Sequence, residues 1–171
     1  MLVLVCGLPG TGKSTVAERV AEVLPARRLR TDVIRKELFP EPTYAAEESA
    51  AVYDELLARA REGLDAGDHV VLDATFRRRE LRQRAATVAE ETGVEFRRVR
   101  VTCEESVVRD RIHERQTEED DESDADFAIY TQLKDEFEPI EDEDHLVVDN
   151  SGPLSETLEA VDDAFGAVAT A

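Results

Sequence analysis

Near its start the chain reads Gly7-Leu8-Pro9-Gly10-Thr11-Gly12-Lys13-Ser14. This stretch fits the P-loop pattern G-x-x-x-x-G-K-S/T, in which a glycine-rich turn points its backbone N–H groups at phosphate oxygens. The apolar run at 1–6 predicts a strand before the turn, and the apolar spacing over 14–24 predicts a helix after it. Because a helix N-terminus adds positive potential to such a turn, the sequence predicts a nucleoside triphosphate-binding site.

Individual residues of this turn have expected tasks. Lys13 can reach the β- and γ-phosphates, and Ser14 can supply a hydroxyl ligand to Mg2+. The glycines let the backbone bend so that successive N–H groups point inward. The nucleotide-binding residues predicted here are Gly7, Gly10, Thr11, Gly12, Lys13, Ser14 and Thr15.

Length and composition limit the classes of protein to consider. The 171 residues suit a single domain, over residues 1–171, with its own hydrophobic core. No apolar run is long enough to span a membrane, and no basic segment precedes the first strand as in a signal peptide. Cys6 and Cys103 fall in predicted strands without metal-ligand spacing, which is typical of a reduced, cytoplasmic protein.

The chain is strongly acidic, with 40 acidic and 21 basic residues and a net charge of −19. Only Lys13, Lys36 and Lys134 are lysines, and the other basic residues are arginines. This balance indicates a soluble acidic surface or, more sharply, a halophilic protein whose self-repulsion is screened by concentrated salt. It also disfavours a nucleic-acid partner, although the arginine clusters leave that alternative open.

Apolar strands alternate with helical segments along the rest of the chain. Strands are predicted at 27–31, 69–73, 94–102 and 146–149, and helices at 33–38, 44–66, 77–92, 104–116, 125–137 and 154–168. The acidic run at 117–124 is predicted to be a solvated loop. The alternation predicts parallel βαβ units and an α/β sandwich with its ligand at the carboxyl ends of the strands. The polar residues delivered to that edge are those of the P-loop, Asp32, Asp73, Glu104 and Asp149.

Asp32 and Arg35 stand three positions apart and would share one face of a first helical turn. In a functional interpretation, Asp32 accepts the proton of an attacking hydroxyl while Arg35 holds an anionic group of the acceptor. The structural alternative is an aspartate that caps the helix beside a solvated arginine.

Asp73 ends the apolar strand Val-Val-Leu-Asp. This is the position of a Walker B acid, which holds Mg2+ directly or through water. The alternative is a capping residue at the end of the strand.

Two arginine clusters follow Asp73. In the segment 77–84, Arg77 lies nearest the sheet edge and can clamp a transferring phosphoryl group, whereas most of the other arginines are expected to pair with acids. Arg111 and Arg115 lie four residues apart on one helical side. They can stack on adenine and neutralise the transferring oxygens, or instead form ion pairs with neighbouring glutamates.

Together these motifs resemble the P-loop kinases of the polynucleotide-kinase and predicted-kinase group. These are relatives of the adenylate, gluconate and shikimate kinases and of zeta-toxin-like and chloramphenicol phosphotransferases. The resemblance rests on the P-loop, Thr-Asp-Val-Ile-Arg at 31–35, Leu-Asp-Ala-Thr-Phe-Arg at 72–77, Arg-Ile-His-Glu-Arg at 111–115, and Ser-Asp-Ala-Asp at 123–126 followed by Phe-Glu-Pro at 137–139. It implies a five-stranded parallel sheet in the order 2-3-1-4-5 with a mobile helical lid at approximately 112–128.

The resemblance also implies residue roles. Asp32 matches the base that activates the acceptor hydroxyl, and Arg35 matches the residue that holds a phosphate on the acceptor. Arg77 matches an arginine on the transferred phosphate, Arg111 the arginine that covers adenine, and Arg115 the lid arginine.

Two departures qualify the comparison. The lid of the family is normally basic, and residues 118–124 here are almost all acidic. The chain also lacks the Asn-Lys-x-Asp signature of guanine sites, which favours ATP over GTP.

We therefore expect an ATP-dependent phosphotransferase that moves the γ-phosphate to a hydroxyl, either of a small molecule or of a nucleic-acid 5′ end. Its expected catalytic residues are Lys13, Asp32, Arg35, Arg77 and Arg115, and its expected Mg2+ ligands are Ser14 and Asp73. The alternative from another class is a nucleotide-binding ATPase module that signals by lid movement without a specific acceptor.

The melting temperature of a halophilic protein of this charge is expected to rise as KCl is added. The reason is that about 1 M salt shortens the Debye length to about 3 Å and screens the repulsion between surface carboxylates. A thermal melting series in KCl measures this effect. A melting temperature that stays flat or falls with salt would end the halophile interpretation.

Overall fold

The computed structural model describes residues 1–115, 120–141 and 143–170, without the side chains of residues 115–126. Strands and helices alternate along almost the whole of this part of the chain. In order they are β1 (Leu2–Cys6), α1 (Lys13–Val23), β2 (Arg27–Arg30), α2 (Thr31–Leu38), α3 (Ala46–Asp65), β3 (Val70–Asp73), α4 (Arg79–Thr92), β4 (Phe96–Thr102), α5 (Glu105–Arg115), α6 (Asp120–Glu136), β5 (Leu146–Asp149) and α7 (Leu154–Ala169). Among the described helices none is long and apolar enough to cross a membrane.

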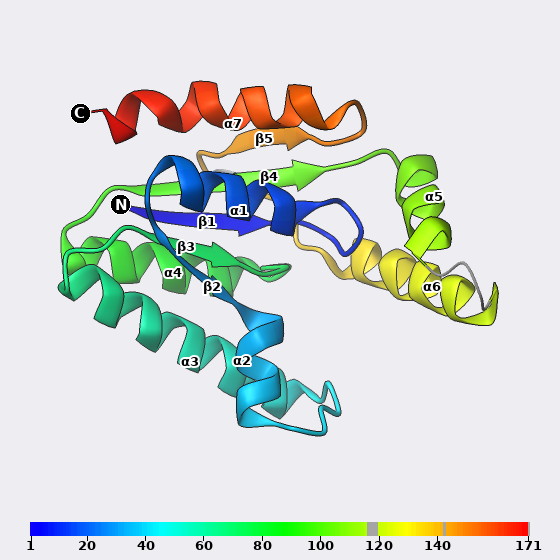
Figure 1. The fold of residues 1–171 in the computed structure, drawn as a ribbon. Coiled ribbons are helices and arrows are strands. Elements are labelled where there is room, and N and C mark those ends of the chain that lie inside the picture. Colours follow the sequence, from blue (N-terminus) through cyan, green and yellow to red (C-terminus); the bar gives the residue numbers. More distant parts are fainter. Residues whose placement is uncertain (116–119, 142, 171) are drawn as a thin grey trace.

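The strands form one parallel sheet in the order β2-β3-β1-β4-β5 (Figure 1), which confirms the predicted order. β1 lies at its centre, and its register places Val5 beside Asp73 of β3 and Cys6 beside Arg100 of β4. Every residue of β1 and β3 is buried, because helices cover the sheet on both faces. The carboxyl ends of the parallel strands therefore meet at one edge of the sheet.

Alternate residues of β1 enter two separate cores. Val3 and Val5 pack on the side of α1 and α7, where Phe165 is fully buried. Leu2 and Leu4 pack on the other side, with α3 and α4. Figure 1 shows the same arrangement, with the sheet between these two helix layers. Successive side chains of a strand point to opposite faces of the sheet, and both faces of β1 are buried. Each residue of β1 is therefore apolar.

α5 and α6 project beyond the carboxyl ends of the strands (Figure 1). The predicted lid at 112–128 corresponds to the end of α5 and the start of α6, and its residues 116–119 lie outside the described chain. The prediction of a loop over 117–124 is wrong from Asp120 onward, where α6 has already begun. Acidic residues in a first helical turn are stabilised by the helix dipole, which favours a helix start where charge density alone suggested a loop.

The other predicted boundaries agree with the structure to within two residues. Cys103 is an exception to the strand prediction, since it follows the end of β4 and is half-buried. Cys6 is fully buried in β1, and this burial raises the pKa of its thiol to about 11. Cys6 is therefore a neutral core thiol at ordinary pH.

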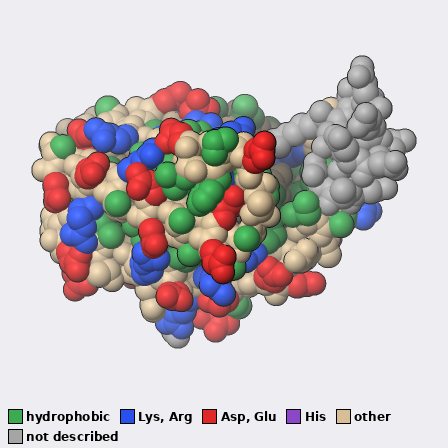
Figure 2. All heavy atoms as spheres, turned by 90° about the horizontal axis from the view of Figure 1, so that it is seen from below, with side chains coloured by type: hydrophobic (Ala, Val, Ile, Leu, Met, Phe, Trp, Pro, Cys, Tyr) green, Lys and Arg blue, Asp and Glu red, His purple; other side chains and the backbone are tan. Residues whose placement is uncertain are grey.

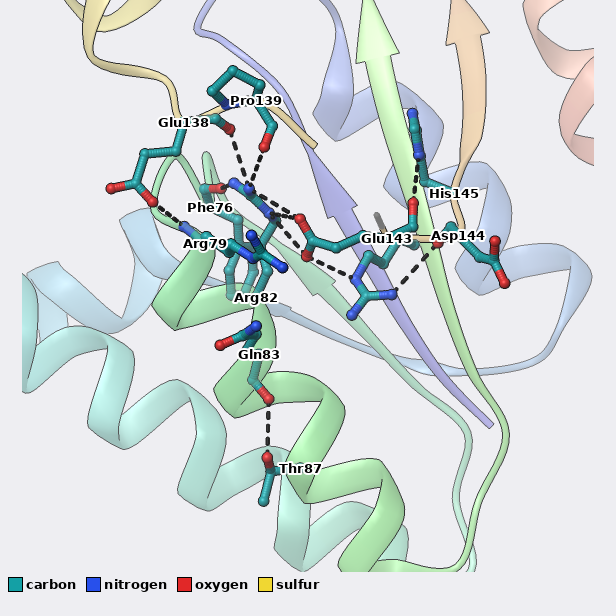
Figure 3. A network of polar contacts seen from close by, with 11 residues as sticks. Phe76, Arg79, Arg82, Gln83, Thr87, Glu138, Pro139, Glu143, Asp144 and His145 are labelled. Carbon is teal, nitrogen blue, oxygen red and sulfur yellow. Dashed lines mark hydrogen bonds and ion pairs between the residues drawn. The ribbon is translucent and has the colours of Figure 1, made fainter. Parts of the chain in front are cut away.

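Arg82 of α4 is fully buried within a polar network (Figure 3). It donates to the carbonyl oxygen of Phe76 at 2.8 Å and to those of Glu138 and Pro139 at 3.1 and 3.2 Å. It also pairs with the buried Glu143 carboxylate at 3.2 Å. Arg82 therefore fixes the segment that leaves α6 against the segment that follows β3.

The substitution Arg82→Met keeps the length of the side chain but removes the donors of this network. Three carbonyl groups, of which that of Phe76 is buried, then lose a donor, and Glu143 loses one of its cations. The free energy of unfolding is expected to fall by about 3 kcal/mol, as for other broken buried ion pairs. Urea denaturation followed by circular dichroism measures this change.

Arg84→Met is the matched control, because Arg84 lies on the same helix in an exposed ion pair with Asp54. That substitution is expected to change the free energy of unfolding by less than about 1 kcal/mol. If both variants unfold at the same urea concentration as the wild type, the buried network has no stabilising role.

Candidate active site

The P-loop is packed tightly between two other parts of the chain. Gly10 and Gly12 have φ angles of 81° and 85°, in the left-handed region where glycine is favoured. A Cβ atom at Gly12 would lie 2.1 Å from the side-chain nitrogen of Asn150, and one at Gly10 would lie 2.9 Å from Val108. Each of these two positions therefore favours glycine for two reasons, the left-handed backbone angle and the close approach of a neighbouring side chain.

Asn150, which directly follows β5, supports the P-loop by hydrogen bonding. Its Nδ2 donates to the carbonyl oxygen of Thr11 at 2.8 Å, while its own Oδ1 accepts from the Thr157 hydroxyl at 2.8 Å. Its backbone oxygen accepts from Arg111 at 2.6 Å. Asn150 is 5% exposed, so these bonds form away from bulk water. The sequence analysis missed this residue, and the only signal for it was its position directly after a strand.

The backbone N–H groups in the first turn of α1 are not capped by a side chain that would compete with a phosphate. Gly12 occupies the N-cap position, where the helix has no side-chain cap, and the first turn contains no acidic residue. Backbone N–H groups at such a helix start can bind phosphate. Arg28 of β2 donates to the carbonyl oxygen of Ser14 at 3.1 Å and so ties this turn to the sheet. Lys13 and Ser14 are half-buried at the start of the helix.

Asp73 ends β3 in the middle of this edge of the sheet. The residue is 4% exposed, and its Oδ2 atom is buried without a hydrogen-bond partner among the described residues. Such an orphaned carboxylate oxygen is rare in folded proteins and indicates a missing cation or water. Asp73 therefore fits the predicted Mg2+ site.

Mg2+ would not be held by protein side chains alone. Within the described part of the chain, no group of three or more His, Cys, Asp or Glu side chains could hold a metal ion. This agrees with the usual behaviour of Mg2+ in nucleotide sites, where phosphates and water supply most ligands and one or two protein oxygens supply the rest. Ser14 and Asp73 are the residues that would supply them here.

Asp32 lies in the first turn of α2, directly after β2, and β2 is the neighbour of the strand β3 that Asp73 ends. Its side chain is 63% exposed and accepts from Arg30 at 2.7 Å. Arg30, not Asp32, occupies the N-cap position, but Asp32 Oδ1 also accepts from the backbone N–H of Val33 in the first turn at 2.9 Å, so the capping alternative stays open. Asp32 is therefore an accessible carboxylate at the edge that carries the P-loop.

Arg35 is not the solvated arginine of that alternative. Its guanidinium is 12% exposed and pairs with Glu48 of α3 at 2.6 Å, and it also lies over the ring of Tyr44. Glu48 accepts as well from the backbone N–H groups of Thr43 and Tyr44. Burial alone would raise the pKa of Glu48, but these donors together with Arg35 lower it. An acceptor phosphate would have to share Arg35 with this charged carboxylate.

The other predicted arginines reach different surroundings. Arg77 pairs with Glu136 at the end of α6 at 2.7 Å and is 40% exposed. Arg111 donates to the backbone oxygen of Asn150 and to Cys103 Sγ, rather than to a glutamate of its own helix. The side chain of Arg115 lies outside the described part. The structure thus gathers the P-loop, Asp32 and Asp73 at one edge, whereas the roles of the arginines stay predictions.

A sequence model of the AAA_33 family, described as an AAA domain, matches residues 2–140. The chain belongs to this family. Among curated proteins, this AAA_33 chain is 37% identical over 123 residues to the uncharacterized protein Rv2004c of Mycobacterium tuberculosis, strain ATCC 25618 / H37Rv. The matched part covers 65% of this chain but only 25% of that relative. This chain therefore matches about a quarter of the length of the relative.

Solved structures with this fold include kinases. The AAA_33 chain is similar to a gluconokinase from Sinorhizobium meliloti 1021, with a TM-score of 0.67 and 22% identity over 97% of this chain and 94% of that one. It is similar also to the Mycobacterium tuberculosis APS kinase CysC in complex with AMPPNP and APS, with a TM-score of 0.69 and 23% identity over 95% of each chain. At these identities the similarity establishes the fold, and the resemblance to P-loop kinases is confirmed at that level.

Asn150→Ala is expected to weaken the binding of a non-hydrolysable ATP analogue about 10-fold. The substitution removes the donor to Thr11 and leaves buried polar groups unsatisfied, which costs about 1–3 kcal/mol. Isothermal titration calorimetry measures the affinity.

Thr157→Val is the matched control, because it removes the hydroxyl partner of Asn150 but leaves the bond to Thr11. The loss of affinity in this control is expected to be smaller. Wild-type affinity in Asn150→Ala would mean that the P-loop needs no support from β5.

Proposed function

We propose that this AAA_33 chain is an ATP-dependent phosphotransferase that moves the γ-phosphate of ATP to a hydroxyl group. The observation that carries the proposal is the placement of three features on neighbouring strands. The P-loop follows β1, the buried and unpartnered Asp73 ends β3, and the accessible Asp32 follows β2. Phosphoryl transfer requires a phosphate-binding loop, a site for Mg2+ and a base, and candidates for all three lie at one edge of the sheet.

Each part has a task in the proposed reaction. The acceptor oxygen forms a bond to the γ-phosphorus, and the bond from the γ-phosphorus to the bridging oxygen of ADP breaks. Asp32 takes the proton of the acceptor hydroxyl. Lys13 and the P-loop N–H groups hold the phosphates, and Mg2+, with Ser14 and Asp73 as its protein ligands, would neutralise charge on the leaving ADP.

A small-molecule acceptor is favoured over a nucleic-acid 5′ end. The net charge of −19 opposes the approach of a polyanion. The gluconokinase and the APS kinase that share the fold are named for small substrates, which supports the same class here. The proposal also includes that the protein is cytoplasmic and adapted to concentrated salt.

One observation favours the rival function of an ATPase module. Arg35 and Arg77, which were expected to hold acceptor and transferring phosphate, are each paired with a glutamate. Following ADP release with and without a panel of hydroxyl compounds separates the two functions. Release that an acceptor stimulates supports the kinase, and a rate independent of every acceptor supports the module.

Asp32→Asn is expected to bind ATP like the wild type but to lose acceptor-dependent transfer by about 100-fold or more. The amide cannot take the proton, and general bases typically contribute about 100- to 10,000-fold. Transfer is measured with ATP labelled in the γ-phosphate.

Asp68→Asn serves as the control, because Asp68 is also a partly exposed aspartate paired with an arginine of β2. It stands just before β3, at the amino end of the strands, away from the proposed site. Its transfer rate is expected to match that of the wild type. Full transfer by Asp32→Asn would remove Asp32 as the base.

A further inference from the structure

A cavity of about 320 Å³ lies between the start of the P-loop, the end of β4 and helix α6. Gly7 and Leu8 line it on the nucleotide side, Tyr130 and Phe137 on the helix side, and Arg100 on the sheet side. Its volume is at the lower end of the range for small-molecule sites. None of the residues predicted to bind the acceptor lines this cavity.

Arg100 brings a positive charge to the cavity that the described residues leave unpaired. Its guanidinium lies 5.4 Å from the centre of the Phe137 ring, and it has no carboxylate partner in the described part of the chain. Arg78, Arg79 and Arg109 also lack an ion pair among the described residues, but they are exposed, whereas Arg100 is half-buried. A half-buried guanidinium without an anion is a ready binding site for a carboxylate or phosphate group.

The surroundings of Arg100 increase this excess of positive charge. Arg82 and Arg98 share the single buried carboxylate of Glu143, at 3.2 and 3.3 Å. Burial of Arg98 lowers its pKa, Glu143 opposes this shift and Arg82 adds to it. All three arginines also act electrostatically on the Cys6 thiol in the neighbouring strand. Two guanidinium groups thus share one carboxylate, and of the three arginines that act on Cys6 only Arg100 lines the cavity.

The other charges of the cavity compensate one another. Lys134 and Glu105 form an ion pair at 3.6 Å, and each side chain is about half exposed. Glu105 therefore does not neutralise Arg100. The remaining lining residues are aromatic, aliphatic or small, which suits the uncharged part of a small ligand.

We propose that the acceptor carries an oxyanion, a carboxylate or a phosphate ester, which Arg100 binds in this cavity while the acceptor hydroxyl lies toward the P-loop. This inference rests on the proposed phosphotransferase function and narrows its substrate class. It assigns to Arg100 the anion-holding task that was expected of Arg35, whose guanidinium is occupied by Glu48.

A binding experiment tests the oxyanion site without catalysis. The P-loop is first saturated with Mg2+ and a non-hydrolysable ATP analogue, so that added anions do not bind there. Acetate, inorganic phosphate and the neutral acetamide are then titrated at constant ionic strength while the melting temperature is followed. Acetate or phosphate, but not acetamide, is expected to raise the melting temperature of the wild type.

Arg100→Met is expected to weaken this anion binding about 10-fold or more, since the charge-assisted hydrogen bonds are lost. Arg100→Lys keeps the charge without the planar fork and should fall between Arg100→Met and the wild type. Arg97→Met is the matched control, because Arg97 lies on the same strand but contacts Glu95 and Phe165 instead. Equal anion affinity in Arg100→Met and Arg97→Met, or equal effects of acetate and acetamide on the wild type, would overturn the proposal.

Transfer assays with paired acceptors separate this inference from the proposed function. Each pair consists of a hydroxy acid and its amide, or of a sugar phosphate and its sugar. The anionic member is expected to be the better acceptor, and Arg100→Met should raise its KM about 10- to 100-fold while the KM for ATP stays unchanged. Equal use of both members would overturn the oxyanion site and leave the phosphotransferase standing. Failure of every acceptor to stimulate ADP release would overturn the phosphotransferase and the acceptor assignment together.

Discussion

The contact between Gly12 and Asn150 is the constraint on which the site depends. A P-loop can bind phosphates only if its N–H groups stay oriented, and within the loop the Thr11 hydroxyl contributes one fixing bond, to the carbonyl oxygen of Leu8 at 2.7 Å. Here the amide of Asn150 donates to Thr11 and leaves no room for a Cβ atom at Gly12. The last strand of the sheet thereby determines the shape of the first loop, although about 140 residues separate them in the sequence.

Arginine is the residue that joins distant segments in this protein. Arg82 connects α4 to the segment after α6, Arg35 connects α2 to α3, and Arg111 connects α5 to the end of β5. A guanidinium has several donors in a fixed plane, so one side chain can satisfy carbonyl and carboxylate groups at the same time. Arg100 differs from these three arginines, because it is half-buried beside a cavity and has no carboxylate partner among the described residues.

Much of the fold could be predicted from the sequence because it follows from local patterns. The apolar runs of β1 and β3 and the glycine turn between β1 and α1 each have one simple structural meaning, and the resemblance supplied the strand order. The acidic start of α6 was predicted wrongly because a dense run of carboxylates has two opposite effects, repulsion and stabilisation by the helix dipole. The contacts of Asn150 with Thr11 and of Arg100 with the Phe137 ring could not be predicted, since they join residues that are distant in sequence.

Asp73 links the stability of the protein to what binds at the end of β3, because one of its buried oxygens has no hydrogen-bond partner among the described residues. A carboxylate buried without a hydrogen bond is unfavourable until a cation or an ordered water reaches it. A cation that binds at this position would therefore also stabilise the fold, and the thermal tolerance of the protein would depend on how much of that cation is present.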